Sequence, residues 1–99
     1  RYVLLREVPF DGDGSFTWER FEERYTADLA NALGNLASRT TAMLEKYSGG
    51  VIPDAADAAV LDADAEDLAA YHAAMDGGRG FLLHEGLAAL WRIVQRANA

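Results

Sequence analysis

Cysteine is absent from this chain of 99 residues, proline occurs only twice, and there is no long apolar run. Without cysteine the chain has no disulfide bond, thiolate metal ligand or cysteine nucleophile, and it fits a reducing compartment such as the cytoplasm. No apolar run approaches the roughly 20 residues that cross a bilayer, so we expect no membrane contact. Residues 1–7 are too few and too charged to form a signal peptide.

Basic residues are also scarce, because nine Lys and Arg stand against 16 Asp and Glu, for a net charge of −7. Residues 54–67 hold six of the acids and no base, so we expect the acidity to be a local, solvated face. An acidic balance counts against strong non-specific binding of nucleic acid, which needs many contacts from Lys and Arg to phosphates.

The sequence is rich in alanine and poor in β-branched residues, which favours helices. Apolar residues recur every three or four positions from Trp18 to Tyr47, so we predict one helix of about 30 residues, capped by Ser15 or Thr17. Ser48-Gly49-Gly50 should end it. Gly34 costs about 1 kcal/mol inside this helix, and we expect a closely packed neighbouring helix to explain it.

The rest of the chain predicts two further helices. One begins at Asp64 as its capping residue, runs to about Met75 and is broken at Gly77-Gly78. The other runs from about Gly80 to the end of the chain. Residues 54–63 are weakly patterned, and their sequence is compatible with a loop or a short helix. We therefore predict an all-α, antiparallel helical bundle, with residues 1–14 as a connector and residues 15–99 as the helical domain.

The chain does not begin with Met and ends inside a helical pattern, so we expect it to be a piece of a longer protein with an incomplete bundle.

Asn35 and Arg39 form the most suggestive polar pair, because residues four apart are neighbours on a helix surface. The Asn35 amide can donate and accept hydrogen bonds, and the Arg39 guanidinium carries five donors. At the edge of the apolar stripe, such a pair could bind a planar polar ligand such as an unpaired base. The plain alternative is a solvated helix edge on which Arg39 pairs with an acid.

No other group of residues indicates catalysis or cofactor binding. His72 and His84 lack the spacing of zinc ligands, so we expect no metal site. The glycine clusters do not follow the patterns of phosphate-binding loops, and no serine has an identifiable His and Asp partner. Trp18 and Trp91 lie on apolar stripes and are expected in the core.

Several strings resemble methionyl-tRNA synthetases: LLREVPF at residues 4–10, DGSF at 13–16 and DLANALGNLASRT at 28–40. The string GLAALWRIVQRAN at 86–98 resembles a later helix of the same family. This resemblance implies a fragment that follows the catalytic domain and contributes to the helical anticodon-binding domain.

The resemblance also implies roles and partners. Asn35 and Arg39 would contact the anticodon loop of tRNA(Met), including the cytosine at its first position. The parent would be a methionine–tRNA ligase whose catalytic domain binds ATP with magnesium; the fragment itself would hold no cofactor, because the HIGH and KMSKS motifs are missing. The competing hypothesis is a helical scaffold or protein-interaction module without RNA contact.

Overall fold

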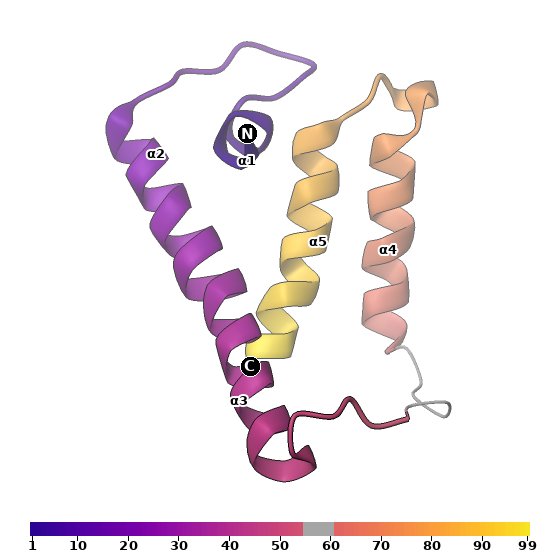
Figure 1. Cartoon of the computed structure of the whole chain (residues 1–99). Helices are drawn as coiled ribbons and strands as arrows, with labels where there is room; N and C mark the ends of the chain where they lie inside the picture. Colours follow the sequence, from indigo (N-terminus) through magenta and orange to yellow (C-terminus); the bar gives the residue numbers. More distant parts are fainter. Residues whose placement is uncertain (55–60) are drawn as a thin grey trace.

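The computed structural model describes residues 1–54 and 61–99, and within these ranges it contains helices and no strands. This confirms the predicted all-α class. Figure 1 shows a long helical rod, a pair of neighbouring helices and a short N-terminal helix. In chain order the elements are α1 (Tyr2–Glu7), α2 (Trp18–Arg24), η1 (Tyr25–Gly34), α3 (Asn35–Ser48), α4 (Asp62–Met75), η2 (Gly77–Arg79) and α5 (Leu83–Asn98).

The rod consists of α2, η1 and α3, which continue one another from Trp18 to Ser48. Its start is capped as predicted, because the Thr17 hydroxyl oxygen accepts a hydrogen bond from the Arg20 N–H at 3.2 Å. At its end Gly49 has a φ of 57°, the left-handed conformation that glycine adopts without a steric penalty. Both predicted ends of the long helix are therefore confirmed.

The middle of the rod is a π-helix, which the sequence analysis did not predict. η1 has this form over ten residues, whereas most π-helices are single turns within α-helices. A Cβ atom at Gly34 would lie 3.1 Å from the carbonyl oxygen of Leu29 in the same rod. The expectation that a neighbouring helix explains Gly34 was thus wrong, because the atom that crowds this position belongs to the π-helical turn itself.

The helices are arranged as an open wedge. α4 and α5 lie side by side and run in opposite directions, α5 approaches the rod near its own C-terminus, and α1 fills the space between the rod and α5 at the other end (Figure 1). The radius of gyration is 16.1 Å, against about 13 Å for a compact domain of this size. The antiparallel arrangement therefore holds for α4 and α5, while the rod meets α5 over a limited length.

Much of the apolar stripe on the rod is exposed, although the sequence predicted it in the core. Trp18, at the beginning of α2, is 71% exposed, and Tyr47, near the end of α3, is 70% exposed. Trp91, also expected in the core, is half-buried. Among the described residues, the buried apolar ones are Val3, Ala74, Leu82 and Ala89.

The two later helices begin at other residues than predicted. α4 starts at Asp62 with Leu61 at its N-cap, so Asp64 lies within the first turn and is not the cap. α5 starts at Leu83 because Gly80 and Phe81 both have positive φ values, 87° and 58°, which a continuing helix does not allow.

Ion pairs join α4 to α5 through acids that were expected to be solvated. Asp67 is only 7% exposed and lies 2.6 Å from the Arg92 Nε atom, and Asp64 lies 2.6 Å from the Arg96 Nη2 atom. Arg96 also binds Asp67, and hydrogen bonds from Arg96 and then Arg92 lower the pKa of the Asp67 carboxyl. The expectation of a solvated acidic face is therefore wrong for these two residues. The expectation for Asp57 lies outside the described residues.

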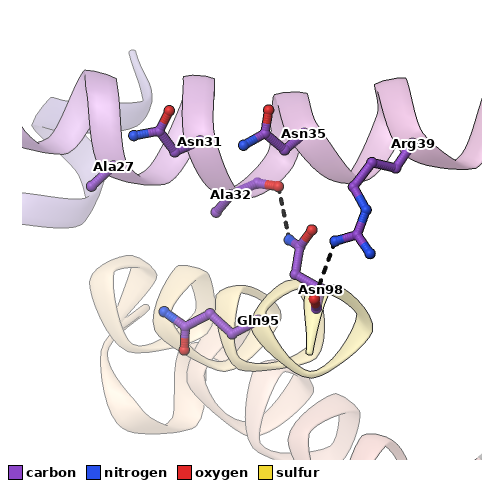
Figure 2. A pocket seen from close by; sticks show the side chains of 7 residues that line it. All are labelled: Ala27, Asn31, Ala32, Asn35, Arg39, Gln95 and Asn98. Atoms are coloured by element: carbon purple, nitrogen blue, oxygen red, sulfur yellow. Dashed lines mark hydrogen bonds between the residues drawn. The ribbon is translucent and has the colours of Figure 1, made fainter.

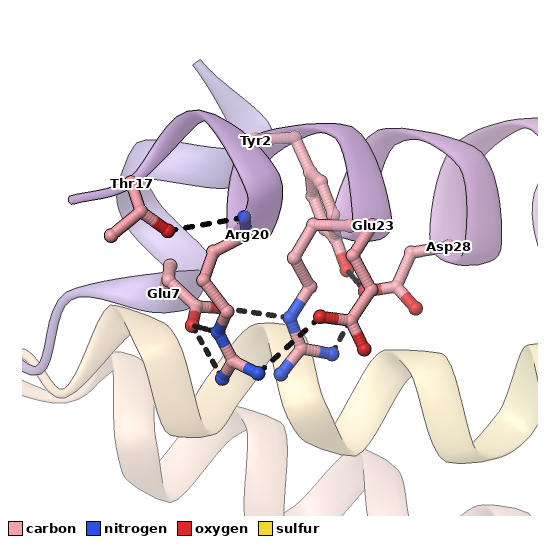
Figure 3. A network of polar contacts seen from close by, with 7 residues as sticks. Tyr2, Glu7, Thr17, Arg20, Glu23 and Asp28 are labelled. Carbon is pink, nitrogen blue, oxygen red and sulfur yellow. Dashed lines mark hydrogen bonds and ion pairs between the residues drawn. The ribbon is translucent and has the colours of Figure 1, made fainter.

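A second polar network joins α1 to the rod (Figure 3). Glu7 accepts hydrogen bonds from Arg20 Nε at 2.8 Å and from Arg24 Nε at 2.7 Å, and the bond from Arg24 is the main cause of the lowered pKa of Glu7. Asp28 accepts a hydrogen bond from the Tyr2 hydroxyl at 2.7 Å. Burial and this bond raise the pKa of Tyr2 well above its usual value.

The lowered pKa values of Glu7 and Asp67 predict how stability changes with pH. Both carboxyls bind protons more weakly in the folded state than in the unfolded state, so their stabilisation is complete above the unfolded pKa values of about 4 and is lost below them. We expect the free energy of unfolding, from urea titrations followed by circular dichroism, to stay level from pH 7 to about 5 and then to fall.

The control is the double variant Glu7→Gln and Asp67→Asn. Its stability should be lower at pH 7 and should change less between pH 5 and pH 3. An equal acid-induced loss in both proteins would show that these two carboxyls do not carry the effect.

Candidate nucleic-acid interface

An open pocket of about 410 Å³ lies where the rod crosses the C-terminal part of α5 (Figure 2). Both residues singled out from the sequence, Asn35 and Arg39, border it, and both are exposed. The complete lining consists of Ala27, Asn31, Ala32, Asn35, Arg39, Gln95 and Asn98.

The lining offers hydrogen-bonding groups with little charge. Four side-chain amides and one guanidinium border the pocket, and its lining contains no carboxylate. Each amide both donates and accepts, whereas the guanidinium only donates. The edge of an unpaired base also alternates donors and acceptors, so this set of groups is suited to such a ligand.

Arg39 reaches from the rod toward the end of α5. Its Nη1 atom donates a hydrogen bond to the backbone carbonyl of Asn98 at 3.3 Å, a contact with a carbonyl rather than with the acid that the alternative interpretation expected. A cation is favoured beside the last carbonyls of a helix. Because one bond uses only part of the five-donor fork, Arg39 keeps donors for a ligand.

Asn35 takes a different direction from Arg39. In Figure 2 its amide lies close to the rod, next to that of Asn31, while Arg39 extends across to α5. The two predicted residues therefore border the same pocket without pointing at one another. A ligand in the pocket would meet their side chains from two directions.

Asn98 connects the end of α5 to the π-helical part of the rod by a hydrogen bond. Its Nδ2 atom donates hydrogen bonds to the carbonyl of Ala32 at 2.9 Å and to the carbonyl of Val94 at 3.1 Å. Its own carbonyl accepts the bond from Arg39. Asn98 thus closes one wall of the pocket and connects both helices that form it.

Sequence reasoning missed Asn31, Gln95 and Asn98 as members of this pocket. Asn31 carried a usable signal, because it precedes Asn35 by four residues as Asn35 precedes Arg39. Gln95 and Asn98 lie three residues apart on α5, but no local pattern indicates that α5 packs against the rod at this point.

In residues 1–54 and 61–99, no group of three or more His, Cys, Asp or Glu side chains is arranged so that it could hold a metal ion. His84 instead accepts a hydrogen bond from the backbone N–H of Phe10 at 3.3 Å. Within these ranges no helix combines the length and the apolar character that crossing a bilayer requires.

The chain is similar to class I tRNA synthetases. Residues 1–41 match the family model of tRNA synthetases class I (M). The chain is 44% identical over 103 residues to a methionine–tRNA ligase from Mesorhizobium japonicum, in an alignment covering 99% of this chain and 19% of that protein. A methionine–tRNA ligase from Halalkalibacterium halodurans is 58% identical over 69 residues, covering 69% of this chain and 10% of that protein.

The structure leads to the same family. It matches the Mycobacterium tuberculosis methionyl-tRNA synthetase solved with methionyl-adenylate, with a TM-score of 0.75 and 39% identity, over 98% of this chain and 20% of that one. The chain therefore belongs to the methionyl-tRNA synthetase family. It spans about a fifth or less of the length of these relatives.

The bonds of Asn98 predict a measurable contribution to stability. Asn98→Ala removes two hydrogen bonds and leaves the Ala32 carbonyl without its partner on α5, so the free energy of unfolding should fall by about 1–2 kcal/mol. Urea titration checks this value. Gln95→Ala is the matched control, because the Gln95 side chain is exposed, and its effect should stay within about 0.5 kcal/mol. Equal losses in the two variants would contradict the role of Asn98.

Proposed function

We propose that this chain is the anticodon-reading segment of a methionine–tRNA ligase. The parent enzyme would join methionine to tRNA(Met) in the cytoplasm, using ATP with magnesium in a catalytic domain outside this chain. Membership of the methionyl-tRNA synthetase family supports the parent activity. The observation that carries the anticodon role is the open pocket in which Asn35 and Arg39 are exposed beside further amides.

The chemistry of the two residues fits the edge of cytosine. The O2 and N3 atoms of cytosine accept hydrogen bonds, which suits the guanidinium of Arg39. Its N4 amine donates, which suits the side-chain oxygen of Asn35. A different base in the anticodon would leave some of these polar groups unpaired, and that cost produces discrimination.

The acidity of the chain limits what this segment does on its own. Electrostatic binding of RNA depends on cations that contact phosphates, and this chain carries a net charge of −7. In this proposal the pocket supplies base selectivity and other parts of the parent supply most phosphate contacts. Residues 1–14 would connect the helical segment to the catalytic domain.

A scaffold role is the second candidate, and exposed apolar surfaces favour it. Leu4, Leu5, Val8, Pro9 and Phe10 border one apolar hollow next to α1. Thr40, Met43, Leu44, Tyr47 and Ser48 border another near the end of α3. Exposed patches of this kind mark contacts with other protein surfaces. If the scaffold role is the only one, substitutions in the polar pocket leave tRNA charging unchanged.

The test of the anticodon role uses the full-length enzyme that contains this segment. Asn35→Ala and Arg39→Ala should each lower kcat/KM for charging tRNA(Met) roughly tenfold to a hundredfold, because a good base contact is worth about 1–3 kcal/mol. Adenylate formation, measured without tRNA as methionine-dependent ATP–pyrophosphate exchange, should not change.

Lys46→Ala is the control for loss of a cation from the rod. The Lys46 ammonium lies over the ring of Tyr47, 5.1 Å from its centroid, near the end of α3 and away from the pocket. This variant should charge tRNA normally. Unchanged charging by Asn35→Ala and Arg39→Ala, with normal circular dichroism, would favour the scaffold role instead.

A further inference from the structure

Part of the pocket wall, Asn31 and Ala32 included, lies on the π-helical segment η1. Helices of this type are rare and short, and they occur frequently at functional sites, yet η1 extends over ten residues. Contacts from outside the rod must therefore help to maintain it. Two come from α5: Trp91 Nε1 donates to the carbonyl of Asp28 at 3.2 Å, and Asn98 Nδ2 donates to the carbonyl of Ala32 at 2.9 Å.

The indole of Trp91 is held in place for this bond. Its ring lies against that of Tyr2, with 4.3 Å between the ring centroids. The hydroxyl of Tyr2 in turn donates to the Asp28 carboxylate at 2.7 Å. Trp91 lies on α5, is half-buried, and contacts α1 and η1. A buried indole N–H normally has a hydrogen-bond partner. This partner is a carbonyl of the π-helix, not another side chain.

The form of η1 determines how the two parts of the pocket wall face each other. Because i→i+5 bonds enclose more residues per turn than i→i+4 bonds, each residue of a π-helix turns through a smaller angle. A return of η1 to α-helix would rotate its residues, Asn31 among them, relative to Asn35 and Arg39. The anchored carbonyls of Asp28 and Ala32 lie on either side of Asn31 in the sequence.

We propose that Trp91 is a positioning residue of the pocket: its indole N–H holds η1 in the π-helical form and so sets the direction of Asn31 relative to Asn35 and Arg39. Trp91 does not line the pocket itself. The inference rests on the proposed function, because it explains how the same pocket is kept in shape for an anticodon.

The experiment is made in the full-length enzyme with Trp91→Phe, which keeps an aromatic ring beside Tyr2 and removes the N–H donor. We expect KM for tRNA(Met) to rise roughly threefold to tenfold, the range of one lost hydrogen bond. The ratio of kcat/KM between tRNA(Met) and the same tRNA with its first anticodon base changed should fall. The kcat at saturating tRNA and the ATP–pyrophosphate exchange should stay unchanged.

Two further measurements keep the test decisive if the smaller ring disturbs packing. Replacing Trp91 with 3-benzothienylalanine preserves the bicyclic shape and removes only the donor, so it should have the same effect as phenylalanine. Hydrogen exchange of the backbone amides of residues 25–34 should become faster in both variants. Trp18→Phe, at an exposed position on the rod, is the matched control and should change none of these quantities.

The outcomes separate this inference from the proposed function. If Trp91→Phe lowers kcat equally for both tRNAs and leaves their ratio unchanged, Trp91 only stabilises the fold and the inference is overturned. If Asn35→Ala impairs charging but the benzothienyl variant discriminates normally, the anticodon role stands and the positioning role fails. If Asn35→Ala has no effect on charging, the proposed function itself fails.

Discussion

Asp28 joins three helices, and the open wedge of the structure depends on it. Its carboxylate accepts a hydrogen bond from Tyr2 on α1 and pairs with Arg24 on α2, while its backbone carbonyl accepts the Trp91 indole N–H of α5. Asp28 is only 8% exposed, and a carboxylate this buried is costly unless it is paired. Here its Oδ2 atom accepts the Tyr2 hydrogen bond and lies 3.4 Å from the Arg24 guanidinium. This residue fixes one end of the contact between rod and α5, and Asn98 fixes the other beside the pocket.

Ion pairing elsewhere in this acidic chain accompanies a polar pocket whose lining carries a single charged group, the Arg39 guanidinium. Arginines of α2 bind Glu7, and arginines of α5 bind Asp64 and Asp67. These cations are engaged in holding helices together, so they are poorly placed to contact phosphates. Arg39 differs because its partner is a backbone carbonyl, and it faces the amides of the pocket. In the proposed function, selectivity would therefore come from amides and one guanidinium, with little electrostatic attraction.

The exposed apolar surfaces indicate contacts with other protein. The described residues bury few apolar side chains, and apolar hollows lie beside α1 and near the end of α3, so the segment has surfaces suited to contact other protein. The chain spans about a fifth of its relatives in the methionyl-tRNA synthetase family, so most of such a protein lies outside it. The proposed base selectivity of the pocket and docking through the apolar hollows are therefore compatible roles for different parts of the same chain.

Features that depend on a few neighbouring residues were determined by the sequence alone. The Thr17 cap, the left-handed Gly49 and the four-residue spacing of Asn35 and Arg39 are local, since each involves atoms within one helical turn. Only the tertiary structure decided the π-helical form of η1 and the pocket shared with α5. Those features require hydrogen bonds between residues 63 and 66 positions apart, and no local pattern specifies which distant donor meets which carbonyl.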